Sequence, residues 1–224
     1  MNNFLIKDNG SLSDTFLKMQ NVIVPDLCIE VGAHAAEFSN YMSKQFNINS
    51  IAFEAGKEIY EKYKDTMESL VSYVNCAISD NDGEATFFVH NSSTMSNNGI
   101  KRVTFMESVP VNKVSCYKLD TYIQKYQFEN VCLWIDVEGA NKEVLLGAKE
   151  TLKKVSSIFI ETEDLSIWKD QWLTKDVELY LEGLDFKKIL SEDVYEHQKN
   201  IIFINTNMVH DIDFKKIKSY KLEY

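Results

Sequence analysis

The feature that most constrains the fold of this chain is a regular alternation of short apolar runs with stretches of helical period. The runs are rich in Val, Ile and Phe and lack the polar–apolar alternation of a half-exposed strand. They span Leu27–Val31, Ser50–Glu54, Val71–Ile78, Val131–Ile135, Ser157–Glu161 and Ile201–Asn205. Strands of this composition are covered on both faces. We therefore expect the strands to form the middle layer of an α/β domain.

The segments between these runs carry apolar residues at helical spacing. Three faces of this kind are Phe38, Tyr41, Met42 and Phe46, then Ile59, Tyr60, Tyr63 and Met67, and later Val144, Leu145, Ala148 and Leu152. Alternation of strand and helix predicts a mostly parallel sheet joined by right-handed crossovers. The expected architecture is a doubly wound α/β fold.

The middle of the chain departs from this alternation. Glu84–Val89 follows the turn Asn81-Asp82-Gly83 and is predicted to return as an antiparallel strand. Residues 91–113 form a long polar stretch. Since loops of that length in compact domains are often lids or binding loops, we expect a loop of this kind here.

The C-terminal part predicts a hairpin on the otherwise parallel sheet. Thr174 is expected to cap a helix that runs to Gly183. Phe186–Leu190 then pairs with Ile201–Asn205 across a polar turn. An antiparallel C-terminal hairpin strand is a common addition to a mostly parallel sheet.

The length of 224 residues fits one domain with short extensions. With 45% hydrophobic residues, the chain can bury a full core without metals or disulfides. We expect an N-terminal extension over residues 1–25 that packs on the domain, a ligand-binding domain over residues 26–206, and a C-terminal tail over residues 207–224.

Charge and composition bound the partners. A net charge of −10 disfavours binding to a phosphate backbone or to anionic lipid. The N-terminus lacks the pattern of a signal peptide, and no stretch is apolar enough to span a membrane. The four cysteines have no zinc or disulfide spacing. We expect a cytoplasmic protein that acts on a small molecule or glycan, with neither a nucleic-acid nor a membrane partner; oligomeric state is not indicated.

The first strand leads into a turn of small residues. The segment from Asp26 to Ser39 carries Glu30 near the strand end and then Gly32. A dinucleotide fingerprint needs Gly-x-Gly-x-x-Gly, whereas His34 and Ala36 stand at the later positions here. An acidic turn repels phosphate but suits the cationic sulfonium and ammonium groups of S-adenosylmethionine. A plain strand-to-helix turn explains this motif alone equally well.

Two further strand ends fit an adenosine cofactor. Glu54 lies at the tip of the second strand, and a carboxylate about 20 residues after the glycine turn can accept both ribose hydroxyls. The third strand ends in Asn75-Cys-Ala-Ile-Ser-Asp80, where adenine can lie against Ala77 and Ile78.

The fourth strand carries the sharpest motif, Leu133-Trp-Ile-Asp-Val-Glu-Gly-Ala-Asn141. We expect Asp136 and Glu138 to point to opposite sides, so that one faces the cofactor and the other anchors the next helix. Buried carboxylates need partners, and two at one strand tip therefore favour function over packing. Asp136 is our candidate for the general base or the acceptor-orienting residue, with Glu138 and His34 as further catalytic candidates.

These motifs resemble the FkbM-type family of S-adenosylmethionine-dependent methyltransferases. The resemblance covers roughly residues 26–205, and its specific part is Asp-Val-Glu-Gly-Ala followed by Leu-Gly-Ala. The matching pieces are Ile29–Ser39, Phe53-Glu54, Asn75–Ser79, Lys118-Leu-Asp120, Ile135–Ala140, Leu146-Gly-Ala148 and Ile158–Glu161. The resemblance implies a class I methyltransferase (Rossmann-like) fold, S-adenosyl-L-methionine as cofactor, and usually O-methylation of a hydroxyl on a sugar or natural product.

The motifs and the resemblance together nominate the site. The expected cofactor-binding residues are Glu30, Gly32, Ala33, His34, Phe38, Ser39, Glu54, Ala55, Cys76, Ala77, Ile78 and Asp136. The expected acceptor-binding residues are His90, Glu138, Asn141, Glu161 and Trp168. The chain departs from the family pattern where His34 and Ala36 replace the common Asn and Gly, and where Asn141 replaces Glu.

Two alternatives stay open on sequence grounds. A divalent metal could bind Asp136, Glu138 and Glu161, but carboxylates alone do not identify a metal centre, so a metal-free site is favoured. A non-catalytic cofactor-binding protein or a Rossmann-type oxidoreductase would share the fold. The acidic turn argues against the oxidoreductase, and the Asp136–Glu138 pair argues against a non-catalytic protein.

Overall fold

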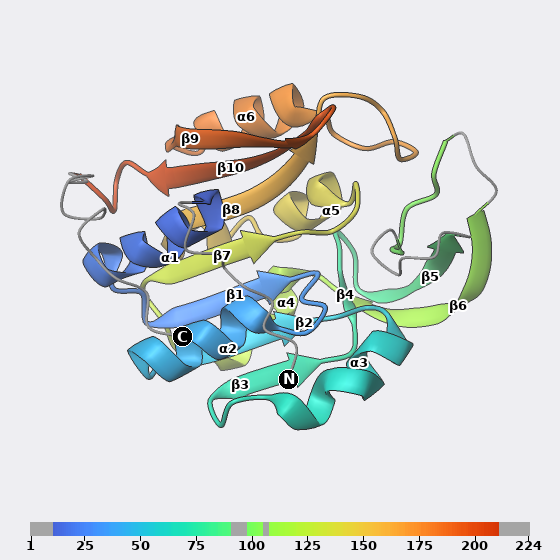
Figure 1. Cartoon of the computed structure of the whole chain (residues 1–224), viewed down its shortest axis with the longest axis horizontal. Coiled ribbons are helices and arrows are strands. Elements are labelled where there is room, and N and C mark those ends of the chain that lie inside the picture. The colour runs from blue at the N-terminus through green and yellow to red at the C-terminus, as the bar shows by residue number, and fades with distance from the viewer. Residues whose placement is uncertain (1–10, 91–97, 105–107, 211–224) are drawn as a thin grey trace.

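The computed structural model describes residues 11–90, 98–104 and 108–210, which form two sheets with flanking helices (Figure 1). The main sheet is made of β1 (Leu27–Val31), β2 (Asn49–Phe53), β3 (Val71–Val74), β7 (Val131–Ile135), β8 (Val155–Glu163), β9 (Phe186–Tyr195) and β10 (Gln198–Asn205). Its strand order is β3-β2-β1-β7-β8-β10-β9. The first five of these are parallel, and β10 is antiparallel to both of its neighbours. The doubly wound sheet with an antiparallel C-terminal hairpin is confirmed.

The order of the strands reverses between β1 and β7, which lie side by side in register from Leu27↔Val131 to Val31↔Ile135. The chain leaves β1 toward β2 and β3, and it leaves β7 toward β8. In open α/β sheets, ligands bind outside the carboxyl ends of the strands at this switch point. These ends lie on the right-hand side of Figure 1.

Helices cover both faces of the sheet. One face is packed against α1 (Leu12–Ile23) and α2 (Glu37–Phe46), and the other against α4 (Leu119–Tyr122), α5 (Asn141–Leu146) and α6 (Thr174–Glu182). The remaining elements are α3 (Lys57–Tyr63) and the 3-10 turns η1 (Lys64–Thr66), η3 (Ile123–Lys125) and η4 (Thr151–Lys154). Thr174 is the first residue of α6 and not its cap, which is Leu173.

The N-terminal helix α1 packs into the core. The Phe16 ring is fully buried, with its centroid 5.7 Å from the ring of Phe159 on β8. The Ser157 hydroxyl donates to the Gln20 side-chain oxygen at 3.3 Å, which ties α1 to the same strand. The division of the chain at residues 25 and 206 stays a prediction, and residues 1–10 and 211–224 lie outside the described part.

A second, smaller sheet stands beyond the carboxyl ends of the parallel strands (Figure 1). It consists of β4 (Ala77–Ile78), β5 (Gly83–His90) and β6 (Ser108–Tyr117), in the order β4-β6-β5. The antiparallel return predicted for Glu84–Val89 is present as β5. The prediction of a loop over residues 91–113 is wrong at its C-terminal end, because residues from Ser108 onward form β6 and pair with β5.

The predicted single strand Val71–Ile78 is divided between the two sheets. β3 pairs with β2, whereas β4 pairs with Cys116 and Tyr117 of β6. The division occurs at Asn75, whose side-chain amide donates to the backbone carbonyl of Glu54 at 2.8 Å. Apolar composition does not distinguish one long strand from two short ones that change sheets.

Among the described helices, none has both the length and the apolar character that crossing a bilayer requires.

Candidate active site

Gly32 joins the ends of three strands. Its φ of 79° lies in the left-handed region, and a Cβ atom built there would lie 1.6 Å from the backbone oxygen of Asp136. The N–H groups of Gly32 and Ala33 donate to the carbonyl of Phe53, at 3.0 and 2.9 Å. Only glycine permits this approach, so the turn after β1 rests directly on the chain leaving β7.

His34 and Ala36 continue the turn in the left-handed region, with φ of 44° and 53°. Residues other than glycine lose about 1–2 kcal/mol in this conformation. The His34 N–H donates to a Glu54 carboxylate oxygen at 2.8 Å, and the Tyr73 hydroxyl donates to the His34 carbonyl. Backbone contacts therefore hold the turn where the family commonly has Asn and Gly.

The His34 imidazole is exposed and packs near Tyr63, with ring centroids 5.3 Å apart. Partial burial and the nearby positive charge of Lys62 lower the pKa of His34. The imidazole is therefore neutral near pH 7, and a catalytic role for it stays a prediction.

Glu54 is the half-buried carboxylate at the end of β2. One oxygen accepts the His34 N–H, and the other accepts the Gly56 N–H at 2.5 Å. Burial raises the pKa of Glu54, although these two hydrogen bonds oppose the shift. Since a carboxylate oxygen can accept about two hydrogen bonds, each oxygen keeps one position for a further donor.

Glu30 is buried in β1 and faces the start of α2. Its carboxylate accepts the Ser39 N–H at 2.8 Å, and burial raises the pKa of Glu30 to about 8 although this hydrogen bond opposes the shift. The N-cap residue Ala36 has no side chain that could cap the helix, so Glu30 satisfies an N–H group of the first turn instead. Its predicted contact with the methionine end of a cofactor stays a prediction.

Phe38 and Ser39 lie in α2 and are both buried. The Phe38 ring packs 4.8 Å from the ring of Trp134 within the core, under the helix. The structure therefore places Phe38 and Ser39 behind the turn, where they support it.

On the opposite side of Glu54, the residues predicted to contact adenine form an apolar wall. Cys76, Ala77 and Ile78 are buried, and the half-buried Ala55 packs with Ala77 and Phe87. Cys76 and Ile78 pack in the main core and Ala77 packs in the core of the small sheet, so these residues join the two sheets. Their contact with adenine stays a prediction.

Three carboxylates converge at the carboxyl ends of β7 and β8. Oxygen atoms of Asp136, Glu138 and Glu161 all lie within 4.8 Å of one another. The prediction that Asp136 and Glu138 point to opposite sides is wrong. β7 ends at Ile135, and residues two apart in a regular strand share a face in any case. A left-handed turn at Glu138 (φ 45°) then accompanies the convergence of its carboxylate with that of Asp136.

Burial raises the pKa of every member of this cluster, and repulsion by neighbouring carboxylates adds to the shift of Glu138 and Glu161. The pKa of Glu161 rises to about 10, that of Glu138 to about 8, and that of Asp136 only to about 6. A hydrogen bond between the Asp136 and Glu161 side chains moderates the shift of Asp136. The Asp136–Glu161 pair therefore retains a shared proton near neutral pH, because burial opposes a second negative charge at this place. Paired carboxylates of unequal pKa are typical of acid–base sites.

A fourth carboxylate, Glu163, is buried on the same strand as Glu161. Burial and the charge of Asp136 raise the pKa of Glu163 to about 7. The Gln171 side-chain amide donates to it at 3.1 Å, and the Gln198 amide donates to Glu161 at 2.6 Å. The cluster is thus contacted by neutral amide side chains. None of its carboxylates forms a salt bridge with a Lys or Arg of the described residues.

Trp168 lies in the wall of the site. It is 1% exposed, and a Cβ atom on Gly139 would lie 2.2 Å from its ring. The ring therefore supports the turn that carries Glu138, and its face is covered. In this conformation Trp168 cannot stack on an acceptor, which corrects that part of the prediction.

Asn141 begins α5 and is 1% exposed. Its amide nitrogen donates to the backbone carbonyl of Glu161 at 2.8 Å, and its amide oxygen has no hydrogen-bond partner among the described residues. His90 ends β5, but its side chain lies outside the described part of the structure.

The segment from residue 98 to 104 crosses the site from the small sheet. Gly99 approaches Glu138, since a Cβ atom there would lie 3.6 Å from the Cβ atom of Glu138. The Lys101 ammonium pairs with Glu143 of α5 at 2.5 Å, with both side chains largely covered. The Thr104 N–H donates to the Ile167 carbonyl at 2.9 Å. This segment thus encloses one side of the acid cluster.

The methyltransferase FkbM domain family matches residues 30–188. The chain belongs to this family. The match includes Glu30, Gly32, Glu54, Asp136 and Glu161, which the structure brings to one edge of the sheet. No curated protein matches the sequence.

Solved structures resemble this FkbM-family chain in fold. An rRNA methylase from Streptococcus thermophilus is 11% identical, with a TM-score of 0.49 over 90% of this chain and 98% of that one. The Streptococcus pneumoniae protein Sp1610, solved with S-adenosyl-L-methionine, is 12% identical, with a TM-score of 0.46 over 84% and 72%. A TehB-like methyltransferase from Corynebacterium glutamicum is 9% identical, with a TM-score of 0.44 over 88% and 90%.

Sequence reasoning missed several members of this FkbM-family site. Glu163 could have been found, because Glu161 and Glu163 are two apart and therefore share a face of one strand. Gln198 and Tyr73 could not have been found in this way, because both reach the site from strands that are distant in sequence from its other members. Lys101 lies in a stretch that the sequence marked only as a polar loop.

Proposed function

We propose that this protein is an S-adenosylmethionine-dependent O-methyltransferase whose acceptor is a hydroxyl of a sugar or natural product. The observation that carries the proposal is the Asp136–Glu161 pair at the same sheet edge as the Glu54-held turn. One side of the switch point is thus built to hold an adenosine, and the other to take up a proton.

The residues present fit S-adenosylmethionine. Each oxygen of Glu54 retains one acceptor position, which matches the two hydroxyls of a ribose. The four carboxylates beyond β7 and β8 lack cationic side-chain partners among the described residues, which suits a ligand with sulfonium and ammonium charges. The half-buried Ala55, which follows Glu54 and packs with Ala77 and Phe87, is our choice for contact with adenine.

S-Adenosylmethionine, when bound, supplies an electrophilic methyl group whose transfer leaves S-adenosylhomocysteine. The residues of the chain orient the acceptor, exclude water and remove the proton of the acceptor hydroxyl. As the acceptor hydroxyl takes up that methyl group, its proton would pass to the Asp136 carboxylate. General-base assistance of this kind contributes about 10²–10⁴-fold, and near-attack positioning about 7–11 kcal/mol.

Glu161 positions the base. Its carboxyl group is hydrogen-bonded to the Asp136 side chain, and the Gln198 side-chain amide donates to Oε1 of Glu161 at 2.6 Å. These contacts orient the Asp136 carboxyl group. Glu138, with the neighbouring Asn141, is our choice for contacts to the acceptor.

The alternatives fit less well. A Rossmann-type oxidoreductase would need a glycine-rich turn that admits a pyrophosphate, and His34 and Ala36 stand where its later glycines would lie. A non-catalytic cofactor-binding protein would retain Glu54 without needing the Asp136–Glu161 pair. The net charge of −10 supports a small-molecule or glycan acceptor over nucleic acid, and a cytoplasmic location stays a prediction.

Calorimetric titration of the purified chain with S-adenosylmethionine, S-adenosylhomocysteine and NAD tests the cofactor. We expect saturable binding of the first two ligands and none of NAD. Glu54→Gln should weaken binding by roughly tenfold, because one acceptor oxygen is replaced by a donor, whereas Glu58→Gln on exposed α3 should change nothing. Binding of NAD in place of the methyl-cycle ligands would overturn the assignment.

A further inference from the structure

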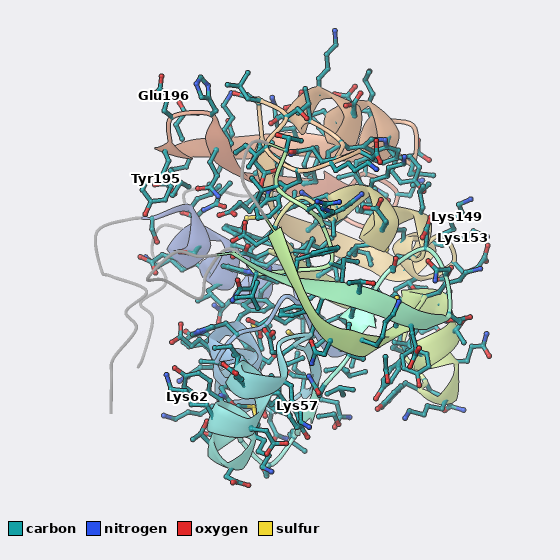
Figure 2. All side chains as sticks on the ribbon, turned by 90° about the vertical axis from the view of Figure 1, so that its right-hand side faces the viewer. Lys57, Lys62, Lys149, Lys153, Tyr195 and Glu196 are labelled. Carbon is teal, nitrogen blue, oxygen red and sulfur yellow. The ribbon has the colours of Figure 1, made fainter. Side chains whose placement is uncertain are left out.

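The loop between β8 and α6, residues 164–173, carries a buried tryptophan beside the acid cluster. Trp168 is the largest of the fully buried side chains, yet the apolar clusters that the described residues form do not include it. Figure 2 looks onto the carboxyl edge of the parallel strands, where β8 ends and this loop begins. Because aromatic side chains are ordinarily buried by packing in an apolar core, the position of Trp168 indicates a different role.

The Trp168 ring lies against the turn that carries Glu138. Gly139 follows Glu138 directly, and a Cβ atom built on Gly139 would lie 2.2 Å from Cγ and 2.3 Å from Cδ1 of Trp168. Both residues of the turn adopt the left-handed conformation, with φ of 45° at Glu138 and 77° at Gly139. A rigid ring packed on the glycine limits the other conformations that this turn could adopt. The ring therefore helps to fix the direction in which the Glu138 side chain leaves the backbone.

The indole nitrogen of Trp168 reaches the fourth carboxylate of the site. The indole N–H is the only hydrogen-bond donor of a tryptophan side chain, and here it is bonded to the Glu163 carboxylate. Glu161 and Glu163 point to the same face of β8, because they lie two residues apart in the strand. Trp168 thus contacts the turn of Glu138 with its ring and the Glu163 carboxylate with its nitrogen.

Gln171 supports the same contact from within the loop. Its side-chain oxygen accepts the backbone N–H groups of Ile167, at 2.7 Å, and of Trp168. The amide nitrogen therefore faces the other way, where it donates to Oε2 of Glu163 at 3.1 Å. Two neutral donors from one loop hold the Glu163 carboxylate, so its orientation is fixed without a cationic partner.

The backbone of Trp168 is fixed separately from its side chain. Val103 of segment 98–104 forms an antiparallel bridge with Trp168, and the Lys169 N–H donates to the Arg102 carbonyl at 2.8 Å. These contacts do not involve the indole. Replacing the side chain of Trp168 should therefore leave the loop in place.

We propose that Trp168 is a positioning residue of the active site, which orients Glu138 through its ring and Glu163 through its indole N–H. Trp168 does not touch the reacting atoms in this role. It acts through Glu138 and Glu163, whose negative charges act on Glu161. The inference deepens the proposed function and rests on it for the link to methyl transfer.

NMR of the full chain, labelled with ¹⁵N at tryptophan, tests the contact through the indole N–H signals. Trp168→Phe identifies the Trp168 signal, which is missing in that variant. In Glu163→Gln we expect hydrogen exchange at the Trp168 indole to become roughly tenfold faster, because a bond to a charged carboxylate is replaced by a weaker one to a neutral amide. The signals of Trp134 and Trp172 should not change. An unchanged Trp168 signal would overturn the proposal, because a tryptophan that only fills space does not respond to the charge of Glu163.

Initial rates test the effect on the reaction, measured as release of S-adenosylhomocysteine with a panel of sugars and hydroxylated natural products. Trp168→Phe should lower kcat by roughly tenfold to a hundredfold, because Glu138 and Glu163 lose their orientation. Its affinity for S-adenosylmethionine should stay within a few-fold of the wild type, because the change removes no charge and leaves Glu54 in place. Trp172→Phe is the matched control from the same loop, where the ring packs with Tyr180 at 5.1 Å, and it should behave like the wild type.

A second variant makes the test independent of the folding of Trp168→Phe. Gln171→Leu removes the other donor to Glu163 and leaves the indole ring in place, so it should lower kcat in the same direction. Urea unfolding shows which variants are folded under the assay conditions. An unchanged kcat in the folded variants, or an equal loss in Trp172→Phe, would overturn the positioning role.

Titration with S-adenosylmethionine separates this proposal from the proposed function. If the wild type does not bind S-adenosylmethionine, or methylates no acceptor, the proposed function fails, and the positioning role fails with it whatever the NMR signals report. If the wild type methylates an acceptor and Trp168→Phe does so equally fast, only the positioning role fails.

Discussion

The carboxylates on the two sides of the switch point differ in their hydrogen-bond partners and neighbours. On the β1–β2 side, Glu30 and Glu54 each accept hydrogen bonds from backbone N–H groups, so the fold itself holds their orientation. On the β7–β8 side, Asp136, Glu138 and Glu161 face one another, and burial and repulsion raise their pKa values. The first arrangement fixes a shape for a ligand. The second leaves charge and protons to be redistributed when a ligand arrives.

The strongest test of this contrast is Asp136→Asn. Removing the ionised carboxylate should lower kcat by about 10²–10⁴-fold once an acceptor is in hand, because the general base is lost. The affinity for S-adenosylmethionine should fall much less than kcat, because Glu54 and the turn are untouched and only one of the four carboxylates loses its charge. Steady-state kinetics and calorimetry measure the two effects, with Asp65→Asn on exposed η1 as the control. An unchanged kcat would remove Asp136 from the mechanism.

The rigidity of the β1–β2 side can be tested with Gly32→Ala. The added Cβ atom meets the Asp136 carbonyl in a left-handed conformation, so the free energy of unfolding should fall by about 3 kcal/mol or more. Urea unfolding measures the loss. Gly183→Ala is the matched control, because its nearest neighbour would lie 3.4 Å away; it should cost about 1 kcal/mol or less. Similar losses for both variants would contradict the inferred close approach.

Lys101→Met removes the ion pair that joins segment 98–104, which lies beside the acid cluster, to Glu143 of α5. This leaves Glu143 without its cationic partner at a largely covered position, and we expect a loss of about 2 kcal/mol in the free energy of unfolding. Lys153→Met, which breaks a pair that is mostly exposed, should cost about 0.5 kcal/mol or less. Thermal and urea unfolding of the two variants compare them. Equal effects would mean that segment 98–104 is not held by this pair.

The smallest expected effect concerns pH. The folded pKa values of Glu138 and Glu163, about 8 and about 7, lie above the ordinary value of 4.5. Between these values the folded chain binds protons that the unfolded chain has released, so stability should fall as the pH rises from about 5 to about 8.

Glu138→Gln removes one of these titrations. It should flatten the decline and raise the free energy of unfolding at pH 8 by about 1 kcal/mol, allowing for partial exposure of the group. Urea unfolding at three pH values reads this out. A stability that rises with pH over the same interval would show that the cluster is compensated by a charge from elsewhere.

The sequence predicted the parts of the fold that depend on local periodicity. β1 and β7 have the predicted bounds, and the family match confirms the resemblance drawn from the motifs around Gly32 and Asp136. What failed depends on contacts between distant segments. β6 lies in a stretch whose polar composition gave no strand signal, and it forms because β5 offers it a partner.

The site divides in the same way. Glu54 and the carboxylates after β7 could be nominated because strand ends of a parallel sheet meet at one edge. The protonation of these carboxylates could not be predicted from the sequence. It depends on the separation of Asp136 from Glu161 and on the amide of Gln198, which comes from the C-terminal hairpin. Trp168 was predicted as a surface contact because it is an aromatic residue in a polar connection. Its burial depends on the close approach of Gly139 to its ring, which the local sequence does not indicate.

The division of Val71–Ile78 between two sheets makes the small sheet a lever on the cofactor side. Asn75 stands at the division, and its amide holds the carbonyls of both Glu54 and Ala55. β4 follows after one residue and is hydrogen-bonded to β6. The backbone at Glu54 is therefore connected to the β5–β6 ribbon through only two or three residues, and the position of the small sheet helps to set the position of the Glu54 carboxylate.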